Sequence, residues 1–420
     1  MKKIKINHIA KIEGHASFMG KLMNGNVKEA RIETEEGARL VEGILLGRKF
    51  SDAPIITARI CGICPVVHNL CSIKAMEAAL NIKVSSQVVI LRKLMEYGQI
   101  IHSDGLHFFW LSLPDFYNEK NTLKVVKFTP AQTASAVKVR EYGMELVKII
   151  GGRTIHPMSS EVGGFKEFPK EKDLKEVLKK YDEAMESIWQ LVKFFEKLKY
   201  PKLENKKEFI SLGSEEEYPV YDGKIVSSDG FKMPIDKFYQ DIEERTYDDK
   251  GGELVKRATY KGRPYGVGAL ARINNNYSQL NKEAKKVLRD TGLKIPIYNS
   301  FYNILAQVVE VAHLIEESKI LIDQYLKIKT IPKNTKYEVK AGFGVSAMEA
   351  PRGMLFHAYK LDKKGDIVDC NIISPTDQML NVIEQDIGEL DLSKLKANQK
   401  KDLIRFLIRA HDPCISCATH

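Results

Sequence analysis

The sequence is poor in cysteine and has no long apolar segment. It contains six cysteines among 420 residues, too few for a fold that depends on disulfides. No apolar run approaches the roughly 20 residues that a transmembrane helix requires, so we expect no membrane span. Residues 1–6 include lysines but lack the apolar core of an export signal, which favours a cytoplasmic location.

Neither glycine nor proline is abundant, and the charge is not of one sign. The 28 glycines and 15 prolines exclude a collagen-like or disordered chain. The 65 lysines and arginines exceed the 55 acidic residues, which gives a net charge of +10. These basic residues alternate with acids and form no basic stripe with interspersed aromatic residues, so we expect no nucleic-acid partner. The composition therefore indicates a globular protein with a lysine-rich surface.

The hydrophobic pattern predicts one helix-dominated α+β domain over residues 1–420. Residues 1–50 are expected to form an N-terminal β region with a peripheral hairpin. An Asn-Gly-Asn turn at 24–26 would join strands at 16–23 and 27–34, because these residue types tolerate positive φ.

Three later segments complete the expected architecture. Apolar residues with helical spacing over 174–198 predict one long helix. Prolines and Asp-Gly turns predict a β-rich insertion at 201–265. A Lys-Lys-Gly turn predicts a second hairpin, within residues 350–376, with strands at 352–361 and 366–374.

Four of the cysteines form two Cys-x-x-Cys pairs that lie far apart in the chain. Cys61 and Cys64 occur early, and Cys414 follows Cys64 by 350 residues, with Cys417 completing the second pair. A two-residue spacing lets both thiolates face one metal, and four sulfurs suit zinc, an iron–sulfur cluster or another thiophilic metal. Structural zinc sites usually take their ligands from one local segment. The separation therefore favours a site in the middle of the fold.

The segments around these pairs resemble the large, catalytic subunit of nickel–iron hydrogenases. The pairs stand in Arg-Ile-Cys-Gly-Ile-Cys-Pro-Val-Val-His at 59–68 and in Asp-Pro-Cys-Ile-Ser-Cys-Ala-Thr-His at 412–420. Further matching motifs are Lys-Ile-Glu-Gly-His at 11–15, Glu-Gly-Ile at 42–44, Ile-His-Ser at 101–103, Leu-His-Phe-Phe at 106–109, Glu-Ala-Pro-Arg-Gly at 349–353 and Ser-Pro-Thr at 374–376. The resemblance covers the whole chain and is greatest to the shorter cytosolic branch that reduces soluble acceptors.

The resemblance implies an enzyme that oxidises dihydrogen reversibly to protons and electrons. Cys61 and Cys414 would bind nickel terminally, and Cys64 and Cys417 would bridge nickel to an iron that carries carbonyl and cyanide ligands. Sulfur donors supply the electron density that such metals need in order to change oxidation state. The expected cofactor is a nickel–iron centre with an open position for the substrate.

The same resemblance implies roles for residues around the centre. Arg352 would hold its guanidinium over the open position, and Asp412 would pair with it. Glu13 would pass protons between Cys417 and the surface, and His68 would donate a hydrogen bond to the bridging sulfur. The residues expected to bind the centre or its diatomic ligands are Pro351, Thr376, Ser374, His68 and Asp412, with Thr376 bonding a cyanide.

A second metal is implied near the C-terminal motif. Glu42, the carbonyl of Ile372 and His420 would hold magnesium or ferrous iron; oxygen ligands suit magnesium, and the histidine is compatible with iron. Family members carry a C-terminal extension that is removed just after the motif histidine. The sequence would therefore be either the processed form or a member that needs no cut.

Two positions depart from the family pattern. Lys11 stands where the family often has arginine, a change that we expect to be tolerated. Ser103 stands where many members have an acid that supports the active-site arginine, and the neighbouring Asp104 is expected to point elsewhere on its helix. The sequence therefore does not identify a second acidic residue, besides Asp412, that would support Arg352.

Electrons are expected to leave through other polypeptides. Outside the two pairs there are only Cys71 and Cys370, which we interpret as small buried hydrophobes and which are too few to hold an iron–sulfur cluster. We expect an iron–sulfur small subunit, together with further electron-transfer subunits, as partners. Two alternatives are a metal-free subunit of the quinone-oxidoreductase type, against which the four paired cysteines argue, and a structural zinc or scaffold protein, in which Arg352 and Glu13 would have no role.

Overall fold

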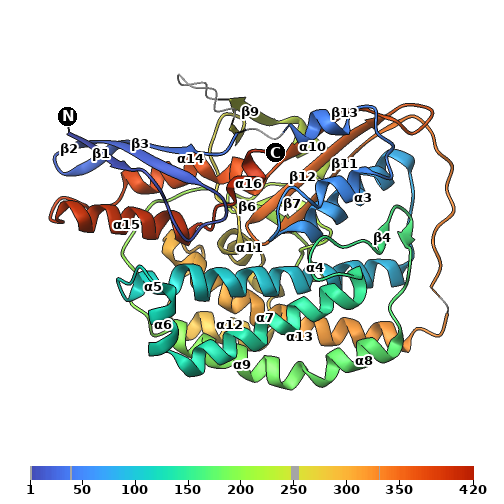
Figure 1. Cartoon of the computed structure of the whole chain (residues 1–420), viewed down its shortest axis with the longest axis horizontal. Helices are drawn as coiled ribbons and strands as arrows, with labels where there is room; N and C mark the ends of the chain where they lie inside the picture. Colours follow the sequence, from blue (N-terminus) through green and yellow to red (C-terminus); the bar gives the residue numbers. More distant parts are fainter. Residues whose placement is uncertain (1, 38–39, 247–254, 331) are drawn as a thin grey trace.

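The computed structural model describes residues 2–37, 40–246, 255–330 and 332–420, and helices dominate its architecture (Figure 1). The predicted N-terminal β region (1–50) and β-rich insertion (201–265) lie partly outside the described residues, at 1, 38–39 and 247–254. The α+β class is the one that the hydrophobic pattern predicts. Among the described residues, no helix has the length and apolar character needed to cross a membrane.

The helices have the following bounds: α1 (Val41–Leu45), α2 (Ala53–Thr57), α3 (Pro65–Leu80), α4 (Ser86–Leu106), α5 (Leu113–Phe116), α6 (Thr122–Phe128), α7 (Pro130–Gly151), α8 (Glu171–Lys179), α9 (Tyr181–Phe195), α10 (Ile235–Gln240), α11 (Ala269–Asn276), α12 (Lys282–Asp290), α13 (Asn303–Lys327), α14 (Pro375–Gly388), α15 (Ala397–Ala410) and α16 (Ile415–Ala418). A π-helical turn, His107–Ser112, continues α4, and short 3-10 turns occur at Tyr277–Gln279 and Ser300–Tyr302.

The strands form small antiparallel sheets, with β1–β3, β6–β8 and β11–β13 in groups of three and β4–β5 and β9–β10 in pairs. Their bounds are β1 (Lys2–Ile6), β2 (Ala16–Met23), β3 (Asn26–Thr34), β4 (Ser160–Glu161), β5 (Gly164–Phe165), β6 (Ile210–Gly213), β7 (Lys224–Ser227), β8 (Lys232–Met233), β9 (Ile242–Thr246), β10 (Lys256–Tyr260), β11 (Gly342–Ala350), β12 (Gly353–Leu361) and β13 (Ile367–Ile373). The hairpin predicted from the Asn-Gly-Asn turn is present as β2 and β3.

Four helices form a bundle that carries much of the main core. Helix α4 packs on α7 and α13, and α9 packs on the same two helices, in the lower half of Figure 1. The apolar side chains of α4 that recur at helical spacing, such as Leu91, Met95 and Ile101, are fully buried. The bundle therefore provides a rigid base for the segments that carry the cysteines.

The single helix predicted over 174–198 is wrong, because the chain forms two helices there, α8 and α9. The break lies at Lys180, whose backbone N–H donates to Val177 O in a three-residue turn. Both helices bury their apolar faces against α7 and α13. The helical spacing of the apolar residues therefore continues across Lys180, and this pattern alone did not reveal the break between the two helices.

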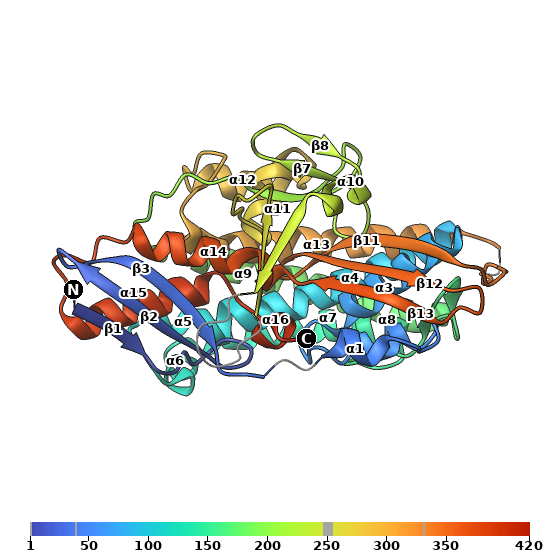
Figure 2. The same ribbon diagram turned by 90° about the horizontal axis from the view of Figure 1, so that it is seen from above.

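The sheet β11–β12–β13 is covered on both faces. Helix α3 packs on β11 and β12, and a second hydrophobic core joins this sheet to the insertion through Met354 and Phe356. Figure 2 shows the insertion, with β7, β8 and α10, rising from one side of the molecule. The predicted hairpin is present as β12 and β13, but the sequence analysis did not predict β11.

A buried carboxylate ties α14 to the segment that leads into the second cysteine pair. Asp386 accepts hydrogen bonds from Lys207 Nζ at 2.6 Å and from His411 Nε2 at 2.8 Å, and also from Ser300 and Asn205. Burial by itself raises the pKa of Asp386, but the charge of Lys207 and the contact with His411 outweigh it and hold the pKa below its ordinary value of 3.8. The carboxylate is therefore ionised near neutral pH.

We expect Asp386→Asn to destabilise the fold by about 3–5 kcal/mol near neutral pH, because it leaves the buried Lys207 ammonium without a carboxylate. Since folding lowers the pKa of Asp386, its contribution is complete above the ordinary value and is lost as the pH falls through the folded value. The gap in thermal unfolding midpoint between wild type and variant should thus be widest at about pH 7 and should begin to shrink only as the pH falls below about 4. Asp402→Asn, which removes only an exposed pair with Arg405, should change little; a gap independent of pH would contradict the assignment.

Candidate metal centre

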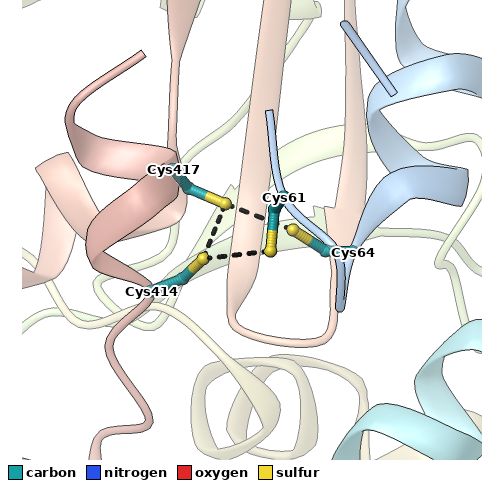
Figure 3. Close-up of side chains that lie close together, drawn as sticks. All are labelled: Cys61, Cys64, Cys414 and Cys417. Atoms are coloured by element: carbon teal, nitrogen blue, oxygen red, sulfur yellow. Dashed lines mark hydrogen bonds between the residues drawn. The ribbon is translucent and has the colours of Figure 1, made fainter. Parts of the chain in front are cut away.

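The two cysteine pairs meet in the middle of the fold, as predicted (Figure 3). The four Sγ atoms all lie within 4.8 Å of one another. Cys64 Sγ is 3.2 Å from Cys417 Sγ, and Cys414 Sγ lies 2.8 Å from Cys417 Sγ and 3.5 Å from Cys61 Sγ. All four side chains are buried, and none forms a disulfide.

The first pair is positioned by the start of α3. Cys64 is the N-cap residue of this helix, and proline follows at its first position, where the missing N–H is not needed. The side-chain carbonyl of Gln99 on α4 accepts hydrogen bonds from the backbone N–H groups of Val66 and Val67. The positive end of the helix dipole therefore lies beside Cys64, although the neighbouring Cys61 and burial raise the pKa of its thiol.

The second pair is positioned by the segment that contains Glu13. Residues Glu13 and Cys414 form a parallel β-bridge, and Ile415 N donates to Glu13 O at 3.0 Å. Gly14 has a φ of +79°, and a Cβ there would lie 2.8 Å from Ile415 Cβ. Glycine is therefore required where the two ends of the chain come together.

The environment of the sulfurs suits a soft metal. Burial, followed by the neighbouring sulfurs, raises the pKa of Cys414 and Cys417 well above the ordinary value, whereas hydrogen bonds from the neighbouring thiols lower the pKa of Cys61. Four thiolates at these separations would repel one another unless a cation lay among them. The donor set, four buried sulfurs beside Arg352, therefore fits a thiophilic metal centre.

Arg352 is held at the edge of the sulfur cluster by a tight turn. The β11–β12 pairing joins Ala350 to Gly353, so that Pro351 and Arg352 form a two-residue turn. Arg352 Nη2 donates to Asp412 Oδ1 at 3.0 Å, which is the expected pair, and among the described residues its Nε and Nη1 have no hydrogen-bond partner. A small cavity of about 10 Å³ is lined by Cys64, Pro351, Arg352, Thr376, Cys414 and Cys417. It has room for about one water-sized species.

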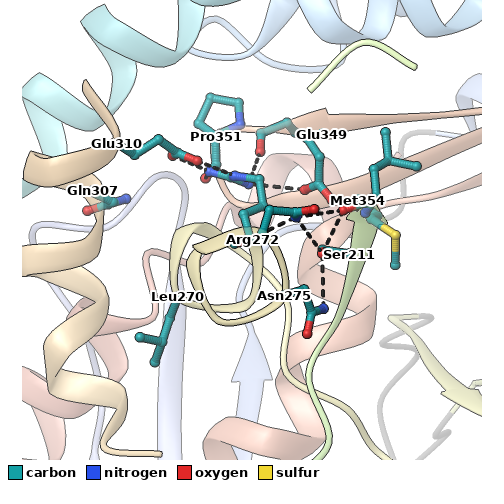
Figure 4. Close-up of polar contacts among 12 residues, drawn as sticks. Ser211, Leu270, Arg272, Asn275, Gln307, Glu310, Glu349, Pro351 and Met354 are labelled. Atoms are coloured by element: carbon teal, nitrogen blue, oxygen red, sulfur yellow. Dashed lines mark hydrogen bonds and ion pairs between the residues drawn. The ribbon is translucent and has the colours of Figure 1, made fainter. Parts of the chain in front are cut away.

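A second arginine, which the sequence analysis missed, holds this turn in place (Figure 4). Arg272 on α11 donates to Ala350 O at 2.9 Å and to Pro351 O at 3.0 Å. Its charge is balanced by Glu310 at 2.6 Å and Glu349 at 3.1 Å, and all three side chains are fully buried. Arg272 therefore fixes the backbone from which Arg352 extends.

The expectation that Asp104 points away from Arg352 is corrected in part. Gln307 Nε2 donates to Asp104 Oδ1 at 3.3 Å and to Asp412 Oδ2 at 3.4 Å, so the amide joins the two carboxylates. Ser103 Oγ is buried without a hydrogen-bond partner among the described residues. Asp104 is thus connected to Arg352 indirectly, through Gln307 and Asp412. Burial, followed by nearby carboxylates, raises the pKa of Asp104.

Glu13 lies at the cluster but contacts a different sulfur from the predicted one. Its Oε2 is 3.0 Å from Cys414 Sγ and accepts a hydrogen bond from Ser416 N at 3.0 Å. The prediction named Cys417 as the partner. The difference follows from the parallel bridge, which sets residue 13 beside Cys414. Ser416 Oγ in turn donates to Glu36 at 3.3 Å, nearer the surface.

The remaining predicted residues surround the sulfurs in distinct ways. His68 Nε2 lies 3.6 Å from Cys417 Sγ. Thr376 Oγ1 accepts a hydrogen bond from Cys414 N at 2.9 Å, so its own proton is available to another acceptor. Ser374 is the N-cap of α14 and exchanges hydrogen bonds with Asp377.

The residues predicted to hold a hard cation also lie together. His420 Nε2 is 2.9 Å from Ile372 O and 3.7 Å from Glu42 Oε1. Burial raises the pKa of Glu42, but His420 and Lys256 outweigh it and lower the pKa to about 2. Lys256 Nζ lies 3.0 Å from this carboxylate. A carboxylate, a carbonyl and an imidazole fit a divalent cation, which would share Glu42 with Lys256.

Comparison with known proteins gives consistent matches along the chain. A profile described as nickel-dependent hydrogenase matches residues 39–142 and 214–420. The alpha chain of sulfhydrogenase 1 from Pyrococcus furiosus is 32% identical, with 99% of this chain and 97% of that protein covered. The alpha chain of sulfhydrogenase 2 from the same organism is 30% identical, covering 99% and 98%. The crystal structure of an NAD+-reducing [NiFe]-hydrogenase in the H2-reduced state superposes with a TM-score of 0.88 at 25% identity, covering 100% of both chains.

Proposed function

Because the chain belongs to the nickel-dependent hydrogenase family, we propose that it is the catalytic subunit that reversibly splits dihydrogen into two protons and two electrons. The observation that carries this proposal is the convergence of four free, buried cysteine sulfurs within 4.8 Å. Cys61 and Cys414 would hold nickel terminally, and Cys64 and Cys417 would bridge it to an iron with carbonyl and cyanide ligands. When bound, this centre would supply the redox chemistry and an open coordination position.

The residues around the centre would bind and orient the substrate and exclude water. The cavity of about 10 Å³ admits only a very small molecule. Arg352 would direct its free N–H groups and fixed charge into this cavity, where low polarity strengthens its field. Pro351, Ser374 and Thr376 would hold the diatomic ligands of the iron.

Glu13 would accept the proton that leaves the cluster. It contacts Cys414 Sγ and is half-buried. The backbone N–H of Ser416 donates to it, and the hydroxyl of the same serine donates to Glu36 nearer the surface. A carboxylate in hydrogen-bond contact with a sulfur is suited to receive a proton and release it to the next acceptor. This contact supports Cys414 as the partner of Glu13.

Glu13→Gln should retain the contact with Ser416 N but cannot carry a proton away. We expect hydrogen–deuterium exchange between dihydrogen and water to fall by about 10²-fold or more, with nickel and iron content unchanged. The measurement is mass spectrometry of dihydrogen isotopologues over the purified complex. Exchange at the wild-type rate would assign the proton route to other residues.

The protein would act with partners and with a second cation. Outside the sulfur cluster, Cys71 contacts Ser346 and Cys370 contacts Glu42 O, and two such cysteines are too few to hold an iron–sulfur cluster. An iron–sulfur small subunit, with further electron-transfer subunits, would therefore receive the electrons. Magnesium or ferrous iron would bind at Glu42, Ile372 O and His420. We place the assembly in the cytoplasm, where a soluble acceptor would be reduced.

The decisive test is elemental analysis of the purified complex together with infrared spectroscopy. We expect one nickel per chain, iron in excess of nickel because the small subunit's clusters also contain iron, and sharp carbonyl and cyanide bands, which only the iron of the centre would give. One zinc per chain without such bands would favour a structural zinc site, and a metal-free chain would favour the quinone-oxidoreductase type of subunit.

A further inference from the structure

A chain of buried hydrogen bonds extends from the sulfur cluster into the core. His68 Nε2 faces Cys417 Sγ, and His68 Nδ1 lies 3.2 Å from His357 Nε2. His357 Nδ1 lies 2.8 Å from the Tyr359 hydroxyl, which is 3.1 Å from Ser72 Oγ. The four side chains beyond the cysteine are at most 1% exposed. The chain therefore ends in the core and does not lead to the surface.

Such a chain has a direction, because a neutral imidazole carries one N–H and one lone pair. In one arrangement the Tyr359 hydroxyl donates to His357 Nδ1, His357 Nε2–H donates to His68 Nδ1, and His68 Nε2–H donates to sulfur. In the reverse arrangement every donor and acceptor is exchanged, and His68 turns a lone pair towards the sulfur. Burial lowers the pKa of His357 and raises the pKa of Tyr359, so both groups are neutral, and with a neutral His68 these two arrangements are the ones available.

Two features of the chain favour the arrangement that donates to sulfur. A metal-bound thiolate carries negative charge and would be repelled by an imidazole lone pair but stabilised by an N–H. At the other end, a phenol hydroxyl is a good donor and an imidazole nitrogen is a good acceptor. Hydrogen bonds in series polarise one another, so a donor at Tyr359 strengthens the donor at His68.

We propose that His357 and Tyr359 fix the tautomer of His68 and thereby set the strength of its N–H···S bond to Cys417. This inference rests on the proposed function, since it takes Cys417 to be a thiolate that bridges the two metals. His357 and Tyr359 are positioning residues, because they act on the sulfur through His68. An N–H that donates to a metal-bound sulfur withdraws electron density from it and so tunes the metals.

The test uses Tyr359→Phe and His357→Leu in the assembled complex. Tyr142→Phe is the matched control, because Tyr142 is a buried tyrosine bonded to Ser318 Oγ at 2.7 Å in the helix bundle. Nickel and iron content, the carbonyl and cyanide infrared bands, and the midpoint potential of the centre from an infrared-monitored redox titration are measured for each protein.

We expect Tyr359→Phe to move the carbonyl band to lower wavenumber and the midpoint potential to a more negative value, at unchanged metal content. A more electron-rich sulfur would raise the electron density on iron and weaken the carbonyl bond. His357→Leu should shift both in the same direction and further, and Tyr142→Phe should match the wild type. If the His357→Leu variant fails to assemble, the carbonyl band and midpoint potential of Tyr359→Phe alone decide whether the inference holds.

Two outcomes would overturn the inference in distinguishable ways. Wild-type bands and potential in metal-loaded Tyr359→Phe would show that the chain does not act on the sulfur, while the proposed function would stand. Absence of carbonyl and cyanide bands from the wild-type complex would overturn the proposed function and this inference with it.

Discussion

Replacing Cys414 with serine should abolish hydrogenase activity and lower the nickel bound per chain. Cys414 Sγ lies 2.8 Å from Cys417 Sγ and 3.5 Å from Cys61 Sγ, at the centre of the sulfur cluster. A serine hydroxyl stays protonated and is a poor ligand for a thiophilic metal. Because loss of a residue that merely supports a metal ligand costs about 10–100-fold, loss of a ligand should leave below about 1% of the activity. Dye reduction by dihydrogen and elemental analysis measure the two effects.

Cys71→Ser is the matched control for this variant. Cys71 is also buried, but its thiol lies 3.1 Å from Ser346 Oγ, outside the sulfur cluster. Burial raises the pKa of Cys71 to about 12, so it remains a thiol, and a hydroxyl can take over its hydrogen bonds. We expect the Cys71→Ser control to bind as much nickel per chain as the wild type. Full nickel and activity in Cys414→Ser would refute the assignment of nickel to the cluster.

The second large effect is expected for Arg352→Lys. The substitution keeps a positive charge near Asp412 but removes the N–H groups that have no partner among the described residues and lie at the small cavity. A lysine ammonium is a point charge that cannot reproduce the planar fork of arginine. Loss of one such fixed donor in an active site costs about 10²–10³-fold. We expect the turnover number to fall by this factor, with nickel and iron content intact.

Arg257→Lys provides a comparison for this variant. Arg257 is buried and paired with Glu384 at 2.7 Å, as Arg352 is paired with Asp412, but it lies on β10. The Arg257→Lys variant should retain a turnover number close to that of the wild type. A loss of nickel in Arg352→Lys would make Arg352 a structural residue of the centre, and unchanged turnover would remove it from the active site.

The parts of the site that could be predicted are those whose chemistry depends on residue type and spacing. The two cysteine pairs indicate a metal ligand set before any fold is known. Asp412 stands two residues before Cys414, whereas Arg352 stands in the separate Glu-Ala-Pro-Arg-Gly motif, and the family resemblance implied the roles of both. The structure brings these residues together as expected. Sequence spacing did not distinguish Cys414 from Cys417 as the partner of Glu13, because the choice depends on the register of a single β-bridge.

The residues that sequence analysis missed are ordinary in composition and special only in position. Arg272, Gln307 and His357 occur in no motif that points to a metal, and each acts through contacts that tertiary packing creates. His357 lies only two residues from Tyr359, but its link to His68 spans 289 residues. No local pattern encodes a contact across such a distance in the sequence.

The missed strand β11 has a similar cause. It contains Gly342 and Gly344, which weaken the alternating pattern of a strand. A Cβ at Gly344 would lie 2.2 Å from Ala75 O, so the close approach of α3 requires glycine there. The feature that hid the strand from sequence analysis is thus the one that lets α3 pack on the sheet.

The bridge between Glu13 and Cys414 should couple unfolding of the two termini to release of the metals. The sulfurs of Cys64 and Cys417 are separated by 353 residues along the chain, and the segment around Glu13 packs over the second pair. A metal shared by these sulfurs closes a loop of nearly the whole polypeptide. Unfolding of either terminus and release of the metals should therefore be one cooperative event. A chelator should lower the denaturant concentration needed for unfolding, and a denaturant should speed the loss of metal to a chelator.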